Sequence, residues 1–220
     1  MKLAVISPES DEPREHAVLA ALCEAGLERY QVRKPSWSRE KLAAWLAEVP
    51  ARHRARLVLH QHHALAVEFS CGGVHFKAND ETQPPAVAGL FTSRSCHTLA
   101  ELSDALGRYD SVFFSPVFPS ISKVGYQPQV DQAELTAMLH ARTEAQRRTT
   151  VIALGGVTPE NCARCAELGF DGVAVLGALW QSAAPLDVFH QLKRALTVSG
   201  ERGMRLGGDA SPYPRRTYVA

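Results

Sequence analysis

Residues 151–180 read VIALGGVTPENCARCAELGFDGVAVLGALW and contain two short apolar runs, about one helix apart. Residues 151–154 are apolar on both sides of the strand alternation, which is typical of a strand buried on both faces. Residues 173–176 repeat this pattern. Between the runs, Thr158-Pro159-Glu160 has the order of an N-cap, a first-turn proline and an early acid, which predicts a helix beginning there. The stretch is therefore predicted to form strand, helix and strand.

Each apolar run is followed directly by glycine. Gly155 and Gly156 come after the first run, and Gly177 comes after Leu176 at the end of the second. Glycine lets backbone N–H groups approach a ligand closely, and a helix N-terminus just beyond favours an anion. The alternative is a pair of tight turns without a ligand. The paired placement favours a phosphate site at these four residues.

The rest of the chain repeats the same alternation of strand and helix. Eight strands are predicted, over residues 3–7, 30–33, 57–60, 73–76, 89–94, 111–115, 151–154 and 173–176. Such alternation implies parallel pairing, and eight units over about 200 residues fit a closed (β/α)₈ TIM barrel of α/β class. A doubly wound open sheet is the alternative.

Length and composition indicate one domain. The 220 residues are 45% hydrophobic, which is sufficient for one substantial core. We expect the barrel to occupy residues 1–198. Residues 199–220 are rich in Gly, Pro and Arg and follow no periodicity, which predicts a disordered tail.

The charge and the N-terminal segment argue against several classes of partner. A formal net charge of +1 is too near neutral for a nucleic-acid surface or an anionic-membrane patch. The apolar run in residues 1–8 is too short for a signal peptide, and no segment approaches a membrane span. We therefore expect a cytoplasmic protein with a small-molecule ligand. The oligomeric state stays open, with a homodimer as one alternative.

Cysteine and histidine clusters raise the question of a metal site. The chain has five cysteines, an odd number without a secretory signal, which favours free thiols. Cys162 and Cys165 lie in a helical pattern without a second pair, which favours ordinary packing over a redox or metal site. The cluster 60-HQHH-63 favours a helix start with one inward ring. His75 is expected to point into the barrel by strand alternation.

Five segments of the chain match a known family in their order and spacing. They are 30-YQVRK-34, 73-GVHFKAND-80, 95-SCHTLAEL-102, 115-SPVFPSISK-123 and the stretch 151–180. Together they resemble the thiamine phosphate synthase and TenI family of thiamine biosynthesis. The resemblance covers nearly all of the predicted barrel. It implies a single-domain barrel enzyme that binds thiazole phosphate or thiamine phosphate.

The resemblance also implies which side chains bind the ligand. Ser120, Ser122 and Lys123 stand where the synthases usually have two threonines and a lysine, and their hydroxyls and cation suit a phosphate. Gln31 and Arg33 match the family's Gln-x-Arg, with both side chains facing the barrel mouth. The alternatives are a solvated lysine at position 123 and an internal salt bridge for Arg33.

Ser95 and His97 match the family's Ser-x-His after the fifth strand. The resemblance places Ser95 at the ligand, while His97 either acts in catalysis or braces the following helix.

Two departures from the family pattern bear on the reaction. A synthase joins a pyrimidine diphosphate to the thiazole phosphate and releases pyrophosphate, for which the family uses Mg²⁺. The family's Asn-Asp after the third strand is His60-Gln61 here, which removes a carboxylate from the magnesium site and leaves Asp80 as the candidate ligand. The family's lysine after the second strand is Pro35, and Lys34 next to it is expected to supply the same charge.

The TenI branch includes thiazole tautomerases, which shift a proton on the thiazole carboxylate phosphate and need no pyrophosphate site. The altered magnesium residues favour this branch. Its histidine after the sixth strand is Pro116 here, so His60 is the expected acid/base, with Lys123 and His97 as further catalytic candidates. The alternatives are a thiamine phosphate synthase, a non-catalytic thiazole phosphate or thiamine phosphate binder, and another phosphosugar-type barrel enzyme.

Overall fold

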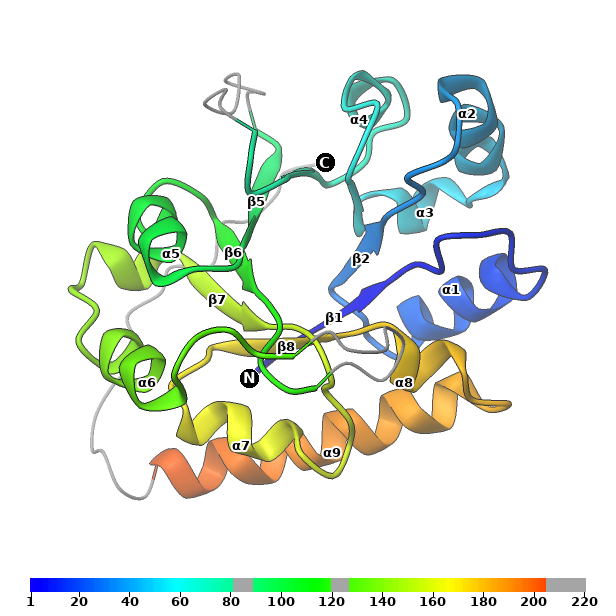
Figure 1. Cartoon of the computed structure of the whole chain (residues 1–220). Helices are drawn as coiled ribbons and strands as arrows, with labels where there is room; N and C mark the ends of the chain where they lie inside the picture. Colours follow the sequence, from blue (N-terminus) through cyan, green and yellow to red (C-terminus); the bar gives the residue numbers. More distant parts are fainter. Residues whose placement is uncertain (81–88, 120–126, 205–220) are drawn as a thin grey trace.

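The structure is a computed structural model that describes residues 1–80, 89–119 and 127–204, the last seven of these by their backbone alone. Eight parallel strands close into one barrel in chain order (Figure 1). The strands are β1 Lys2–Ile6, β2 Arg29–Val32, β3 Leu57–Leu59, β4 Gly73–Phe76, β5 Phe91–Cys96, β6 Ser111–Phe114, β7 Thr150–Ala153 and β8 Gly172–Val175. Each predicted strand is present, shifted by at most two residues at either end.

Pairing of the first and last strands confirms the closed barrel over the open sheet. β1 lies parallel to β8, with Lys2 opposite Gly172 and Val5 opposite Val175. Strand alternation divides the core into two layers. Ala4, Ile6 and Ala174 pack inside the barrel, whereas Val5 and Val175 pack outward against the helices.

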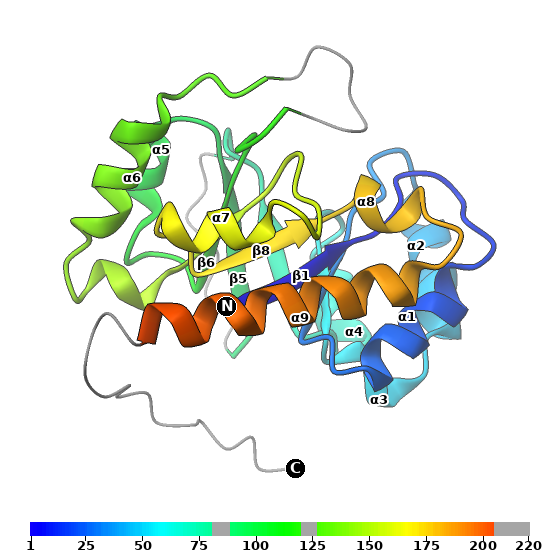
Figure 2. The same ribbon diagram turned by 90° about the horizontal axis from the view of Figure 1, so that it is seen from below.

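The helices surround the barrel. They are α1 Glu15–Glu24, α2 Arg39–Glu48, α3 Ala51–Arg54, α4 Ala64–Glu68, α5 Leu99–Ala105, α6 Gln132–His140, α7 Cys162–Glu167, α8 Gly177–Trp180 and α9 Pro185–Met204, with a 3₁₀ turn at Gln146–Arg148. Figure 2 shows α9 running lengthwise beside α7, α8 and α1, and contacts join it to all three.

The predicted start of the helix after β7 was wrong. The α7 helix begins at Cys162, because Thr158 to Asn161 form a turn instead of a first helical turn. The Asn161 side chain accepts a hydrogen bond from the Thr158 N–H at 2.8 Å and donates one to the Gly156 carbonyl at 2.8 Å. This turn fixes the loop that carries Gly156.

The cysteines are packed into the protein interior, as predicted. All five are free and buried, and burial raises the pKa of the Cys165 thiol to about 12. The described part of the chain contains no group of three or more His, Cys, Asp or Glu arranged to hold a metal ion.

The C-terminal boundary differs from the prediction, since α9 continues through residue 198 to Met204. The remainder of the predicted tail, residues 205–220, lies outside the described residues. No helix within the described ranges is long and apolar enough to cross a membrane.

Candidate active site

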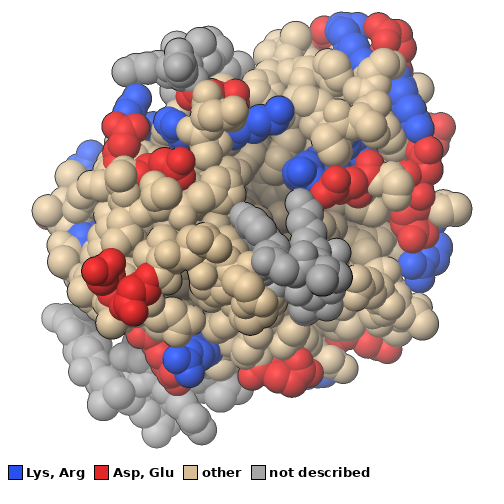
Figure 3. Space-filling model, in the orientation of Figure 1, with Lys and Arg blue, Asp and Glu red and all other residues tan. Residues whose placement is uncertain are grey.

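A cavity of about 800 Å³ opens at the carboxyl ends of the strands. Figure 3 shows it as the hollow near the centre of this face. Most of the predicted site residues line it, namely Arg33, His60, Ser95, His97, Gly155, Gly156, Leu176 and Gly177. Ser120, Ser122 and Lys123 lie outside the described residues, so their predicted roles stay predictions.

Gly155 and Gly156 form one wall of the cavity, in the loop after β7. Both have left-handed backbone conformations, with φ of +92° and +65°. A Cβ atom on Gly156 would lie 2.3 Å from the carbonyl oxygen of Pro119, and one on Gly155 would lie 2.9 Å from Pro116. Glycine is therefore required by the backbone conformation and by the close approach of the loop after β6.

Leu176 and Gly177 come from the end of β8, where α8 begins. Trp180, in the same short helix, donates its indole N–H to the Ile6 carbonyl at 2.7 Å. This hydrogen bond holds the start of α8 against the end of β1. The two predicted glycine loops thus meet at the same cavity, on neighbouring strands β7 and β8.

The opposite side of the cavity contains a stack of two histidines. The His60 and His75 rings lie 4.0 Å apart between centroids and nearly parallel. His60 Nε2 lies 3.1 Å from Gln31 Oε1. The Gln31 side chain is buried and is not among the residues that line the cavity. Gln31 therefore contributes to the site by holding the His60 ring in position.

Two serines bind the ring of His75. Nδ1 lies 2.9 Å from Ser93 Oγ, and Nε2 lies 2.8 Å from Ser95 Oγ. Burial lowers the pKa of His75 to about 3, and the electrostatic effects of His63 and Arg33 lower it further. Burial, His75 and Arg33 likewise hold the pKa of His60 well below its usual value. Both imidazoles are therefore uncharged near neutral pH.

His97 both lines the cavity and braces the chain. Its Nδ1 lies 2.8 Å from the Ser115 carbonyl. Because a carbonyl oxygen only accepts hydrogen bonds, Nδ1 carries the proton and donates it. The backbone N–H of His97 donates to Glu101 in the cap of α5. These contacts agree with the alternative in which His97 braces the helix that follows it. A catalytic role for His97 stays a prediction.

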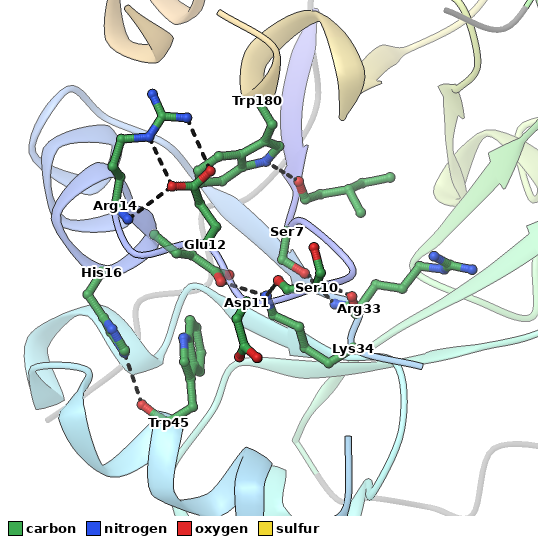
Figure 4. A network of polar contacts seen from close by, with 12 residues as sticks. Ser7, Ser10, Asp11, Glu12, Arg14, His16, Arg33, Lys34, Trp45 and Trp180 are labelled. Carbon is green, nitrogen blue, oxygen red and sulfur yellow. Dashed lines mark hydrogen bonds and ion pairs between the residues drawn. The ribbon is translucent and has the colours of Figure 1, made fainter. Parts of the chain in front are cut away.

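Arg33 and Lys34 are neighbours in sequence but point to different places (Figure 4). Arg33 lines the cavity and forms an ion pair with Glu9. Lys34 is fully buried, where its Nζ lies 2.6 Å from Glu15 Oε2 and 3.1 Å from the Ser10 carbonyl. The expectation that Lys34 supplies a cation to the ligand was wrong, because Glu15 holds it inside the protein.

Among the described residues, His60, Gln61 and Asp80 do not fit the magnesium site that the resemblance implies. Asp80 Oδ2 accepts a hydrogen bond from the Lys77 N–H at 2.7 Å and closes the turn after β4. Gln61 uses its amide on the backbone of Lys34, with Nε2 at 2.5 Å from the carbonyl oxygen. His60 offers a neutral imidazole where a hard cation prefers oxygen.

Sequence reasoning missed several members of this site. Glu9 and Lys77 line the cavity, and Ser93 lies beneath it as a partner of His75. Ser93 follows from strand alternation, because it lies two positions before Ser95 on β5. No sequence pattern of this kind indicates the ion pair between Glu9 and Arg33, since it joins the loop after β1 to the loop after β2.

Comparisons with known proteins agree with this geometry. The family model TMP-TENI, described as thiamine monophosphate synthase, matches residues 3–179. A thiamine-phosphate synthase of Methylobacillus flagellatus is 31% identical over 204 residues, covering 86% of this chain and 93% of the relative. One from Listeria monocytogenes serotype 4a is 28% identical over 189 residues, covering 80% and 86%. The crystal structure of a thiamine phosphate pyrophosphorylase from Bacteroides thetaiotaomicron superposes with a TM-score of 0.76 at 29% identity, covering 90% of this chain and 98% of that one.

Proposed function

The chain belongs to the thiamine monophosphate synthase family of enzymes, and from this premise we propose that it binds a thiazole phosphate in the barrel mouth and shifts a proton on the thiazole ring without a metal ion. The phosphate lies against the loops after β7 and β8. There the backbone N–H groups of Gly155, Gly156 and Gly177 are the proposed donors. The ring then extends toward the histidine side of the same cavity.

The observation that carries the proposed reaction is the uncharged His60 at the cavity wall. A neutral imidazole accepts a proton from a carbon acid and returns it at another position, as general acid/base catalysis requires. His75 stacks on this ring and Gln31 contacts its Nε2, so the ring is held in one orientation. The lowered pKa makes His60 a weak base that stays unprotonated at neutral pH.

The charges of the site support proton transfer over condensation. Release of pyrophosphate requires cations around the leaving group. Lys34 is held by Glu15 inside the protein, Asp80 closes a turn, and Glu9 competes with any ligand anion for Arg33. Proton transfer on a bound thiazole phosphate needs none of these groups.

Condensation to thiamine phosphate is the second candidate. It is favoured by the names of the relatives, which are thiamine-phosphate synthases over most of the chain. In that case Arg33, Lys77 and Lys123 are the side chains available to neutralise a diphosphate.

Deuterium exchange distinguishes the two reactions. The protein is incubated in D₂O with the thiazole carboxylate phosphate and EDTA, and incorporation of deuterium at the carbon atoms of the ligand is followed by NMR. We expect exchange that EDTA does not inhibit, and a decrease of about 100-fold or more in His60→Gln, since a positioned acid/base contributes roughly 10²–10⁴ in rate. His62→Gln is the matched control, because His62 instead contacts the Trp37 carbonyl at 3.0 Å.

Three outcomes contradict the proposal. Unchanged exchange in His60→Gln removes His60 as the acid/base. Binding without exchange identifies a non-catalytic binder. Rapid thiamine phosphate formation from thiazole phosphate, pyrimidine diphosphate and Mg²⁺, without exchange, identifies a synthase.

A further inference from the structure

The ion pair between Arg33 and Glu9 lies at the rim of the cavity, which both residues line. Figure 3 shows basic and acidic side chains next to one another at the rim of the central hollow. The two side chains are 34% and 41% exposed, so water and ligands reach both. Arg33 follows β2 and Glu9 follows β1, so the pair joins two neighbouring loops.

The backbone around Arg33 is fixed independently of Glu9. Ser7 Oγ accepts a hydrogen bond from the Arg33 N–H at 2.8 Å and donates one to the Arg33 carbonyl at 3.1 Å. The arginine therefore stays at the cavity when its carboxylate partner is removed. Loss of the Glu9 charge is expected to free the guanidinium without moving the strand end.

Glu9 differs from Glu101, the second carboxylate among the described residues that line the cavity. Glu101 Oε2 accepts hydrogen bonds from the N–H groups of His97 at 2.6 Å and Thr98 at 3.2 Å, and so caps α5. Glu9 instead neutralises a cation that also lines the cavity. It therefore competes directly with any anionic group of a ligand that approaches Arg33.

We propose that Glu9 is a specificity-determining residue that acts as an internal counter-ion of Arg33, so that a second anionic group of a ligand competes with Glu9 for Arg33. The relevant groups are a ring carboxylate or a diphosphate. The identity of the ligand rests on the proposed function, but the competition for Arg33 does not. A ligand whose single anionic group binds at the glycine loops does not meet Glu9.

The physical basis is like-charge repulsion next to one guanidinium. A carboxylate already bonded to Arg33 lies within a few ångströms of any second anion there, and such a contact disfavours binding. An exposed ion pair is a weak interaction, because water solvates both partners. Glu9 is therefore displaceable, and its presence weakens the binding of ligands with a second anion.

The test compares Glu9→Gln with Glu12→Gln by isothermal titration calorimetry. Glu12 is in the same loop, but it pairs with Arg14, at 2.9 Å, and neither residue lines the cavity. The probes are thiazole phosphate, its ring-carboxylated derivative and inorganic pyrophosphate. In Glu9→Gln we expect the last two to bind about three- to fivefold more tightly, as for loss of an exposed charge contact, with thiazole phosphate unchanged within about twofold. A second substitution, Arg33→Gln, should remove the gain.

The outcomes separate this inference from the proposed function. If neither thiazole compound binds but pyrophosphate still binds more tightly to Glu9→Gln, the proposed function fails and the role of Glu9 stands. The role of Glu9 is overturned if pyrophosphate binds none of the proteins, or if Glu9→Gln leaves its affinity unchanged or lower. It is also overturned if all three probes gain equally, or if Glu12→Gln gives the same gain.

Discussion

His75 shows how the barrel interior sets the charge of a side chain. The ring lies between Ser93 and Ser95, with Phe113 at its edge and His60 on its face. The two hydroxyls satisfy both ring nitrogens with His75 in its neutral form. A proton added to this ring would have to be accommodated in a buried site, which explains the lowered pKa.

We therefore expect acid to destabilise the fold through His75. Its pKa falls from 6.5 in the unfolded chain to about 3 in the folded protein, so its stabilising contribution is fully present above pH 6.5 and is lost as the pH falls toward 3. Within that window, one such group lowers the free energy of unfolding by about 1.4 kcal/mol per pH unit. Urea denaturation between pH 7 and pH 4 should show a shallower slope for His75→Gln.

The exposed His190→Gln variant on α9 is the control and should keep the wild-type slope. An identical slope in wild type and His75→Gln would show that His75 is not the source of the acid sensitivity. Burial also lowers the pKa of His60, so His75→Gln is expected to keep part of the dependence of stability on pH.

At the scale of elements, the loop after β7 and the loop after β6 form one packed unit. The Val117 N–H donates to the Leu154 carbonyl at 2.9 Å, and the Phe118 N–H donates to the Gly155 carbonyl at 3.1 Å. Gly156 lies against Phe118 and Pro119. The two glycines thus let one loop lie directly on the other, and a bulky substitution there changes the packing as well as the proposed phosphate site.

Gly156→Ala should therefore lower the free energy of unfolding by more than the strain of its left-handed backbone conformation alone. A left-handed alanine costs about 1–2 kcal/mol, and the clash with the Pro119 carbonyl adds about 1–3 kcal/mol of overpacking. Gly89→Ala is the matched control, because Gly89 also has a left-handed φ, of +87°, but a Cβ there meets no atom of the described residues within 4 Å. Chemical denaturation of the two variants measures the difference. Equal losses would mean that the neighbouring loop moves aside freely.

At the scale of the whole molecule, the last unit of the barrel is fastened to the first. β8 pairs with β1, and the indole of Trp180 reaches across from α8 to the Ile6 carbonyl. Closure removes both edges of the sheet, so every strand has two neighbours. The cavity depends on this closure, because Ile6 and Leu176 line it from the two strands that meet there.

Trp180→Phe tests the contribution of this connection. Phenylalanine keeps one six-membered aromatic ring but loses the N–H donor and the rest of the indole, which leaves the buried Ile6 carbonyl without that partner. We expect the free energy of unfolding to fall by about 1–3 kcal/mol. Far-UV circular dichroism in urea should still give one cooperative transition. A loss below about 0.3 kcal/mol would mean that water replaces the indole as donor.

The sequence by itself determined the barrel, the order of its strands and the residues at their carboxyl ends. These features depend on periodicities of 2 and 3.6 residues and on glycines directly after apolar runs, which are local. These patterns, together with the resemblance to the family, placed Arg33, His60, Ser95 and the glycines at one cavity, because all parallel strands end on the same side of a barrel.

Only the tertiary structure decided which of these groups are available for chemistry. Arg33 and Lys34 are adjacent in sequence, but Glu9 pairs with one at the cavity and Glu15 with the other in the interior. The helix predicted at Thr158 begins later because Asn161 folds back onto the preceding loop. Such pairings join loops or turns whose distance is set by closure of the barrel and by packing of the helices, and no local periodicity encodes that distance.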